Sequence, residues 1–252
     1  MTILSHTLVF PLALGSTVLS MAVYSATGRS KDADQEKKSG QLFLGAGDFL
    51  LHWSMWAIGP ITRLSLRLGL TPDFYNYVGL LLGVAAGALV GAGRLEAGGW
   101  CIALSGIADI LDGRIARLSG VASDFGDFID STFDRYVEAA AFLGFLYLLR
   151  GHAWGPFLAA FALAGSLIVS YARARGEVLG VLCTGGLMQR GERLVLTCLT
   201  CLSDRAVCRL FSWPQDTVVL GMLAFIGATT LMTAIHRTVW IAARLKEKQR
   251  RA

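Results

Sequence analysis

The sequence has few charged residues for its length. Lys, Arg, Asp and Glu make up 16% of the 252 residues, and apolar residues make up 54%. Soluble proteins average about 25% charged residues. Together with several long uncharged runs, this composition predicts a polytopic helical membrane protein. The net charge of +5 does not indicate nucleic-acid binding, because the basic residues gather at the ends of apolar segments, where membrane topology explains them.

Histidine and cysteine are also scarce, which argues against a zinc site. The four histidines share no common spacing. Cys198 and Cys201 form a C-x-x-C pair, but neither a second pair nor a neighbouring histidine completes a zinc set. We therefore expect the five cysteines to be small apolar packing residues.

The first part of the chain differs from the rest. Residues 7–27 carry no charge and form either a signal peptide or an anchor helix; we favour an anchor, because no basic residue precedes them. Residues 28–40 are polar and read as a linker. Residues 47–70 place apolar side chains at helical spacing, which predicts an amphipathic helix in the membrane interface, interrupted or kinked at Pro60.

The remaining chain predicts six membrane spans and a basic tail. The spans are expected near 74–93, 97–117, 125–149, 155–175, 191–210 and 215–237. The expected division is an anchor and linker at 1–40, a main domain at 41–240 and a basic cytoplasmic tail at 241–252. The predicted fold class is therefore an all-α polytopic membrane protein with six core helices, an anchor helix and an interfacial helix.

The basic residues predict how the protein is oriented. If the N-terminus lies outside and seven spans follow, most of the 23 Lys and Arg fall on the cytoplasmic side. The exceptions are Arg94, Arg150, Arg205 and Arg209. The positive-inside rule then places the C-terminus in the cytoplasm. We expect an inner-membrane protein whose functional site opens at the cytoplasmic leaflet.

Four aspartates stand inside this apolar sequence between residues 109 and 134. Asp109 and Asp112 are three apart, and Asp130 and Asp134 are four apart, so each pair projects from one helix face. Intramembrane acids are costly and therefore mark candidate functional sites. Two such faces form a cage for hard divalent cations that serve phosphates, and one carboxylate is able to accept a hydroxyl proton. The alternative is that the acids are helix caps or paired charges.

The residues around the acids are small or basic. The sequence D-x-x-D-G-x-x-A-R-(x8)-G-x-x-x-D-x-x-x-D resembles the signature of the CDP-alcohol phosphatidyltransferases. The resemblance covers roughly residues 47–240. It implies a six-helix membrane fold, usually a homodimer, that uses Mg²⁺ or Mn²⁺, as two ions. It also implies an enzyme of the EC 2.7.8 type, which transfers a phosphatidyl group from CDP-diacylglycerol to an alcohol and releases CMP.

The resemblance also implies roles for individual residues. By position, Asp109, Asp112 and Asp130 look like metal ligands, and Asp134 looks like a general base that also contacts a metal. The cytidine-diphosphate pocket would include Gly113, Ala116, Arg117 and Gly126. The family often has Thr-Pro-Asn before the first span, whereas this chain has Asp73 at the third position, so Asp73 or Asn76 would make that nucleotide contact.

Four arginines predict the alcohol acceptor. Guanidinium groups beside the metal site favour an acceptor that carries a phosphate, although positive-inside anchoring would also explain them. The arginines are Arg173, Arg175, Arg190 and Arg193. Their segment is similar to that of the phosphatidylinositol-phosphate and archaetidylinositol-phosphate synthases, which implies inositol 1-phosphate as acceptor. Glycerol 3-phosphate is the alternative acceptor. A divalent-cation carrier and an inactive scaffold are the alternatives to an enzyme.

Overall fold

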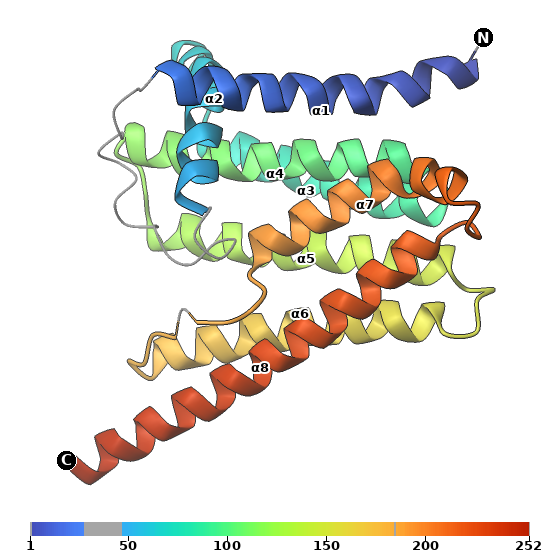
Figure 1. Ribbon diagram of the computed structural model, residues 1–252. Coiled ribbons are helices and arrows are strands. Elements are labelled where there is room, and N and C mark those ends of the chain that lie inside the picture. The colour runs from blue at the N-terminus through green and yellow to red at the C-terminus, as the bar shows by residue number, and fades with distance from the viewer. Residues whose placement is uncertain (1, 28–46, 184, 252) are drawn as a thin grey trace.

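The computed structural model describes residues 2–27, 47–183 and 185–251, which form eight α-helices (Figure 1). In chain order these are α1 (Thr2–Thr27), α2 (Gly47–Arg67), α3 (Pro72–Gly91), α4 (Leu95–Leu118), α5 (Asp124–Leu148), α6 (Gly155–Val178), α7 (Arg190–Leu210) and α8 (Thr217–Arg251). The all-helical class is thus confirmed. The expected linker at 28–40 lies outside the described residues.

Helices α3 to α8 coincide with the six expected core helices, and α8 is the one that differs most in length. It continues from the last expected span to Arg251, so the expected basic tail is helical as far as that residue. Its Lys, Arg, Glu and Gln residues are good helix formers, which explains the continuation. In the part of the chain that the structure describes, α3, α6 and α8 are long and apolar enough to cross a membrane.

The core helices pack around α3 and α8. Helix α3 packs against α4 and α5, while α8 packs against α6 and α7, and the pairs α4–α7 and α5–α6 close the bundle. Glycines allow α3 and α5 to approach closely. A Cβ atom on Gly87 would collide with the backbone of Ala140, and one on Gly144 would collide with the backbone of Gly87. The centre of the bundle is apolar and includes Val90, Leu95, Phe145, Leu223 and Ile226.

The two N-terminal helices contact each other through aromatic side chains. Trp53 of α2 donates a hydrogen bond from Nε1 to Oγ of Ser20 in α1, over 3.0 Å. The ring of Tyr24 in α1 contacts those of Phe49 and Trp56. Pro60 lies inside α2 without ending it, so of the two expected outcomes, an interruption or a kink, the interruption is not found.

The other end of the bundle is held together by a buried acid. Asp204 of α7 is fully buried, and its Oδ1 accepts hydrogen bonds from the backbone N–H groups of Val218 and Val219, at 3.1 and 3.2 Å. It thereby caps the first turn of α8 from a neighbouring helix. The buried Cys183, Cys201 and Cys208 are free thiols, as expected for packing residues.

Candidate active site

The four aspartates come together from α4 and α5. Because α3 packs against both helices, it sets the separation at which their acidic faces meet. One carboxylate oxygen from each of Asp109, Asp112 and Asp130 lies within 4.8 Å of the other two. Three carboxylates at this spacing are a donor set that fits a hard divalent cation. These three residues could therefore hold a metal ion.

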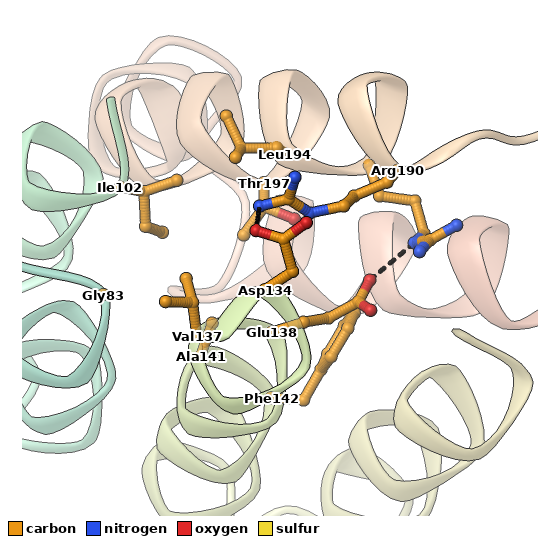
Figure 2. Close-up of a pocket in the computed structure, with 11 residues that line it drawn as sticks. Gly83, Ile102, Asp134, Val137, Glu138, Ala141, Phe142, Arg190, Leu194 and Thr197 are labelled. Atoms are coloured by element: carbon orange, nitrogen blue, oxygen red, sulfur yellow. Dashed lines mark hydrogen bonds and ion pairs between the residues drawn. The ribbon is translucent and has the colours of Figure 1, made fainter. Parts of the chain in front are cut away.

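Asp134 has a different neighbour. Nη2 of Arg190, the first residue of α7, pairs with Oδ1 of Asp134. Nη1 of the same guanidinium lies 3.0 Å from Oδ1 and 3.2 Å from Oδ2 of Asp109. Figure 2 shows the Arg190 and Asp134 side chains pointing toward each other over the cleft. One arginine thus offsets part of the negative charge of the acid cluster.

A second ion pair lies one helical turn further along the same two helices. Nε of Arg193 donates to Oε1 of Glu138 over 2.6 Å, and the side chains are 3% and 11% exposed. Glu138 was not among the expected site residues. It follows Asp130 and Asp134 at successive intervals of four, so extending that row along the helix would have found it.

The other two expected arginines lie elsewhere. Arg173 and Arg175 are exposed near the end of α6, and Nε of Arg173 pairs with Oε1 of Glu177 over 2.8 Å. Arg190 and Arg193 line the cleft beside the acids, whereas these two do not. The structure therefore places two of the four arginines, Arg190 and Arg193, along the cleft.

The cleft has two adjoining parts that share Asp134 and Arg190. The first contains the four aspartates and Asn76, whose side chain is buried. The second continues between α3, α4, α5 and α7 and holds about 480 Å³ of space, its open mouth included. Asp73 is exposed in the first turn of α3. Of the two alternatives at this position, Asn76 is thus the one beside the acids.

The residues expected to bind the nucleotide lie where α4 ends and α5 begins. The backbone N–H of Gly113 donates to Oδ1 of Asp112, and the N–H of Gly126 donates to Oγ of Ser123 over 3.2 Å. Ala116 is half-buried and Arg117 is exposed. This connection is at the same end of the bundle as the acid cluster, with small residues and exposed backbone that a flat ligand is able to approach.

Helix α8 holds the segment that leads to Arg190. Oγ1 of Thr233 accepts hydrogen bonds from the N–H groups of Leu187 and Met188, and Nε of the buried Arg237 donates to the carbonyl of Gly185 over 2.9 Å. These contacts were not predictable from the sequence. Their partners are about fifty residues apart in the chain, and no local pattern signals such a pairing.

The fold and the site define an integral membrane protein with a carboxylate-rich site beside a buried arginine. The family model for CDP-alcohol phosphatidyltransferase matches residues 70–242. The chain therefore belongs to the CDP-alcohol phosphatidyltransferase family and is a transferase of phospholipid biosynthesis. The matched region begins after α2, so it includes neither α1 nor α2.

Two curated relatives have related activities. The chain is 33% identical over 180 residues to archaetidylinositol phosphate synthase of Methanothermobacter thermautotrophicus, covering 71% of this chain and 87% of that protein. It is 36% identical over 189 residues to phosphatidylinositol phosphate synthase of Streptomyces avermitilis, covering 72% and 76%.

Crystal structures of a mycobacterial relative share the fold. The phosphatidylinositol phosphate synthase of Mycobacterium tuberculosis in complex with manganese and citrate has a TM-score of 0.63 and 30% identity, covering 72% of this chain and 87% of that chain. The same synthase with CDP-DAG bound has a TM-score of 0.62 and 30% identity, covering 72% and 92%. The manganese in the first structure agrees in kind with the carboxylate donor set described above.

Proposed function

We propose that the enzyme transfers the phosphatidyl group of CDP-diacylglycerol to inositol 1-phosphate, giving phosphatidylinositol phosphate and CMP. The observation that carries this proposal is the placement of Arg190 and Arg193 in the cleft beside the acids. A phosphate on the acceptor would give these guanidinium groups an anionic partner close to the reacting hydroxyl. The names of the two similar synthases support the same product class.

Each acid has a separate role in this proposal. Asp109, Asp112 and Asp130 would hold the divalent metal, Mg²⁺ or Mn²⁺, which would neutralise charge on the pyrophosphate of the CDP-lipid. Asp134 accepts the proton of the acceptor hydroxyl. The hydroxyl oxygen then forms a bond to the phosphorus that carries diacylglycerol, and the bond from that phosphorus to the CMP oxygen breaks. The electron pair of the broken bond leaves with CMP.

Arg190 prepares Asp134 for this step. Its guanidinium contacts both Asp134 and Asp109, so it favours the ionised form of the Asp134 carboxylate and orients it toward the cleft. At the α4–α5 connection, the cytidine and its phosphates lie against the small residues Gly113, Ala116 and Gly126, with Arg117 as a donor. Asn76 offers an amide on the opposite wall of the cleft. In this proposal Arg173 and Arg175 attract the anionic acceptor to the entrance.

The proposed arrangement in the membrane follows the charge and aromatic distribution. Helices α3 to α8 span the inner membrane with the acid site at the cytoplasmic leaflet, α1 is an anchor, α2 lies in the interface, and two copies form a homodimer. At the end of the bundle away from the acids, exposed Trp154 and Trp213 and the stacking of Arg150 on Tyr147 suit the opposite interface.

An acceptor panel tests the proposal. Purified protein in detergent is supplied with CDP-diacylglycerol and Mg²⁺, and separate reactions receive inositol 1-phosphate, glycerol 3-phosphate, serine or free inositol. We expect CMP release with inositol 1-phosphate, its loss in EDTA and its recovery with Mg²⁺ or Mn²⁺. If CMP is released only in the reaction with glycerol 3-phosphate, the acceptor is glycerol 3-phosphate and not inositol 1-phosphate. No release in any reaction would overturn the proposed reaction.

A further inference from the structure

Two consecutive ion pairs bridge α5 and α7 across the cleft. Asp134 and Glu138 are four apart on one face of α5, and Arg190 and Arg193 are three apart on one face of α7. The pairs are Asp134–Arg190, which Figure 2 shows, and Glu138–Arg193. The first pair belongs to the acid cluster, whereas nothing in the proposed reaction yet uses the second carboxylate.

Arg193 keeps one donor unpaired although it is buried. The residue is 2% exposed and lines the cleft. Its Nε is bound by Glu138, but within the described ranges no hydrogen-bond partner is found for its buried Nη1. Burying an unpaired guanidinium donor is costly, so such an atom in a cleft indicates a place for an anionic oxygen. Binding through Nε holds one edge of the guanidinium and leaves its Nη1 end available.

We propose that Glu138 is a positioning residue for acceptor binding. It holds Arg193 by the Nε edge and so directs Nη1 to an oxygen of the acceptor's phosphate monoester. This inference rests on the proposed function, because it requires an acceptor with a phosphate. Glu138 has a second effect: it gives Arg193 a carboxylate of its own, so that the guanidinium does not compete with Arg190 for Asp134, one turn away on the same face of α5.

The side chain at position 138 determines what Arg193 is able to do. Gln keeps an oxygen that accepts the Nε hydrogen bond but removes the charge that balances the buried guanidinium. Asp keeps the charge but is shorter by one methylene, so it holds Arg193 less well. The effect of either change falls on the acceptor, because neither Glu138 nor Arg193 is among the residues proposed for the metal or the CDP group.

Steady-state kinetics of four variants test this role. Glu138→Gln, Glu138→Asp, Arg193→Ala and the double variant of Glu138→Gln with Arg193→Ala are compared with the wild type, varying inositol 1-phosphate and CDP-diacylglycerol separately. We expect Glu138→Gln to raise KM for inositol 1-phosphate roughly ten- to hundredfold, with KM for CDP-diacylglycerol within about twofold. Glu138→Asp should give a smaller rise in this KM. In the double variant, KM for inositol 1-phosphate should be no higher than in Arg193→Ala alone.

Two controls separate positioning from a general loss of structure. Glu247→Gln removes the carboxylate of an exposed Arg–Glu pair on α8 and should change neither KM. Melting in detergent, with and without inorganic phosphate or inositol 1-phosphate, shows whether each variant folds and still binds an anion. We expect both compounds to raise the melting temperature of the wild type and of Glu138→Asp, and to raise that of Glu138→Gln less. If Glu138→Gln does not fold, the KM values of Glu138→Asp test the positioning role.

The outcomes distinguish the two proposals. If the wild type uses inositol 1-phosphate but the Glu138 variants change both KM values equally, or only kcat, the positioning role is overturned and the proposed function stands. Additive effects of Glu138→Gln and Arg193→Ala would also overturn it. If the wild type uses only an acceptor without phosphate, both proposals fail.

Discussion

Asp130 and Asp134 are one helical turn apart on the same face of α5, yet they have different neighbours. The Asp130 carboxylate lies with those of Asp109 and Asp112, whereas Asp134 meets the guanidinium of Arg190. A carboxylate held by an arginine remains available as a proton acceptor, while a group of three carboxylates requires a cation. Position along one helix thus gives these two acids the different surroundings on which their proposed roles depend.

The substitution Asp134→Asn tests the role of the proton acceptor. Asn has nearly the same shape but does not take the hydroxyl proton, so we expect CMP release to fall roughly 10²–10⁴-fold. The variant should remain folded, as size-exclusion chromatography in detergent would show. Asp127→Asn is the matched control, because Asp127 is exposed on the same helix and should retain activity. If Asp134→Asn releases CMP at the wild-type rate, Asp134 is not the general base.

Spacing predicted part of the site but not its partners. The intervals between Asp109 and Asp112 and between Asp130 and Asp134 placed both pairs on helix faces, and the structure brings these faces together. The partner of each arginine was not predictable. Arg190 and Arg193 pair with acids more than fifty residues earlier, and such pairings depend on how α5 and α7 are arranged, which helical periodicity does not encode.

At the scale of helices, the approach of α3 to α5 depends on the absence of side chains. A methyl group on Gly87 would collide with the backbone of Ala140, which is not able to move aside as a flexible side chain does. We expect Gly87→Ala to destabilise the protein by about 1–3 kcal/mol and to lower its melting temperature. Gly221→Ala in α8 is the control, since no atom lies within 4 Å of the added Cβ. An unchanged melting temperature for Gly87→Ala would contradict the close packing.

The connection between α7 and α8 contains an acid that is unfavourable when charged. Burial, and to a lesser extent Asp204, raises the pKa of Asp216 above its ordinary 3.8, against the opposing effects of Arg205 and His152. The folded state therefore binds the proton more tightly than the unfolded state. Stability is then lost as pH rises from 3.8 through the raised pKa, and the penalty is complete above it.

Asp216→Asn should remove this penalty. Asn also tolerates the left-handed backbone at this position, where φ is 63°. We expect a higher melting temperature at neutral pH and a smaller fall in melting temperature as pH rises from about 4 to 7. The measurement is a thermal melt in detergent at several pH values, with Asp127→Asn as control. A lower melting temperature at neutral pH would mean that the charged carboxylate stabilises this connection.

Apolar periodicity located the helices well, and the differences have physical causes. The six core helices coincide with long apolar or amphipathic runs bounded by Gly, Pro and polar residues. Helix α2 continues through Pro60, so one proline does not end this helix. The length of α8 was underestimated because its last turns lie beyond the apolar run, where hydropathy no longer marks the helix.

At the scale of the molecule, the proposed orientation is testable by chemical labelling. Single cysteines are introduced in a background without the native thiols, as Gln215→Cys between α7 and α8 and as Gln249→Cys near the end of α8; both positions are exposed. We expect a membrane-impermeant maleimide to label Gln215→Cys in intact cells and Gln249→Cys only after the cells are opened. The reverse labelling pattern would mean that the protein has the opposite orientation in the membrane.

The ion pairs between α5 and α7 also constrain how the protein is made. Helix α5 carries Asp130, Asp134 and Glu138, but the arginine that pairs with Glu138 is synthesised 55 residues later. We expect a cysteine placed at Ala139 of α5 to be labelled by a membrane-impermeant maleimide in a nascent chain that ends at Val178, and to be protected in a chain that ends at Leu210. Replacing Arg190 and Arg193 by Gln in the longer chain should restore labelling. If the cysteine is already protected in the shorter chain, α5 settles in the bilayer alone; otherwise, integration of this helix waits for translation of its partner.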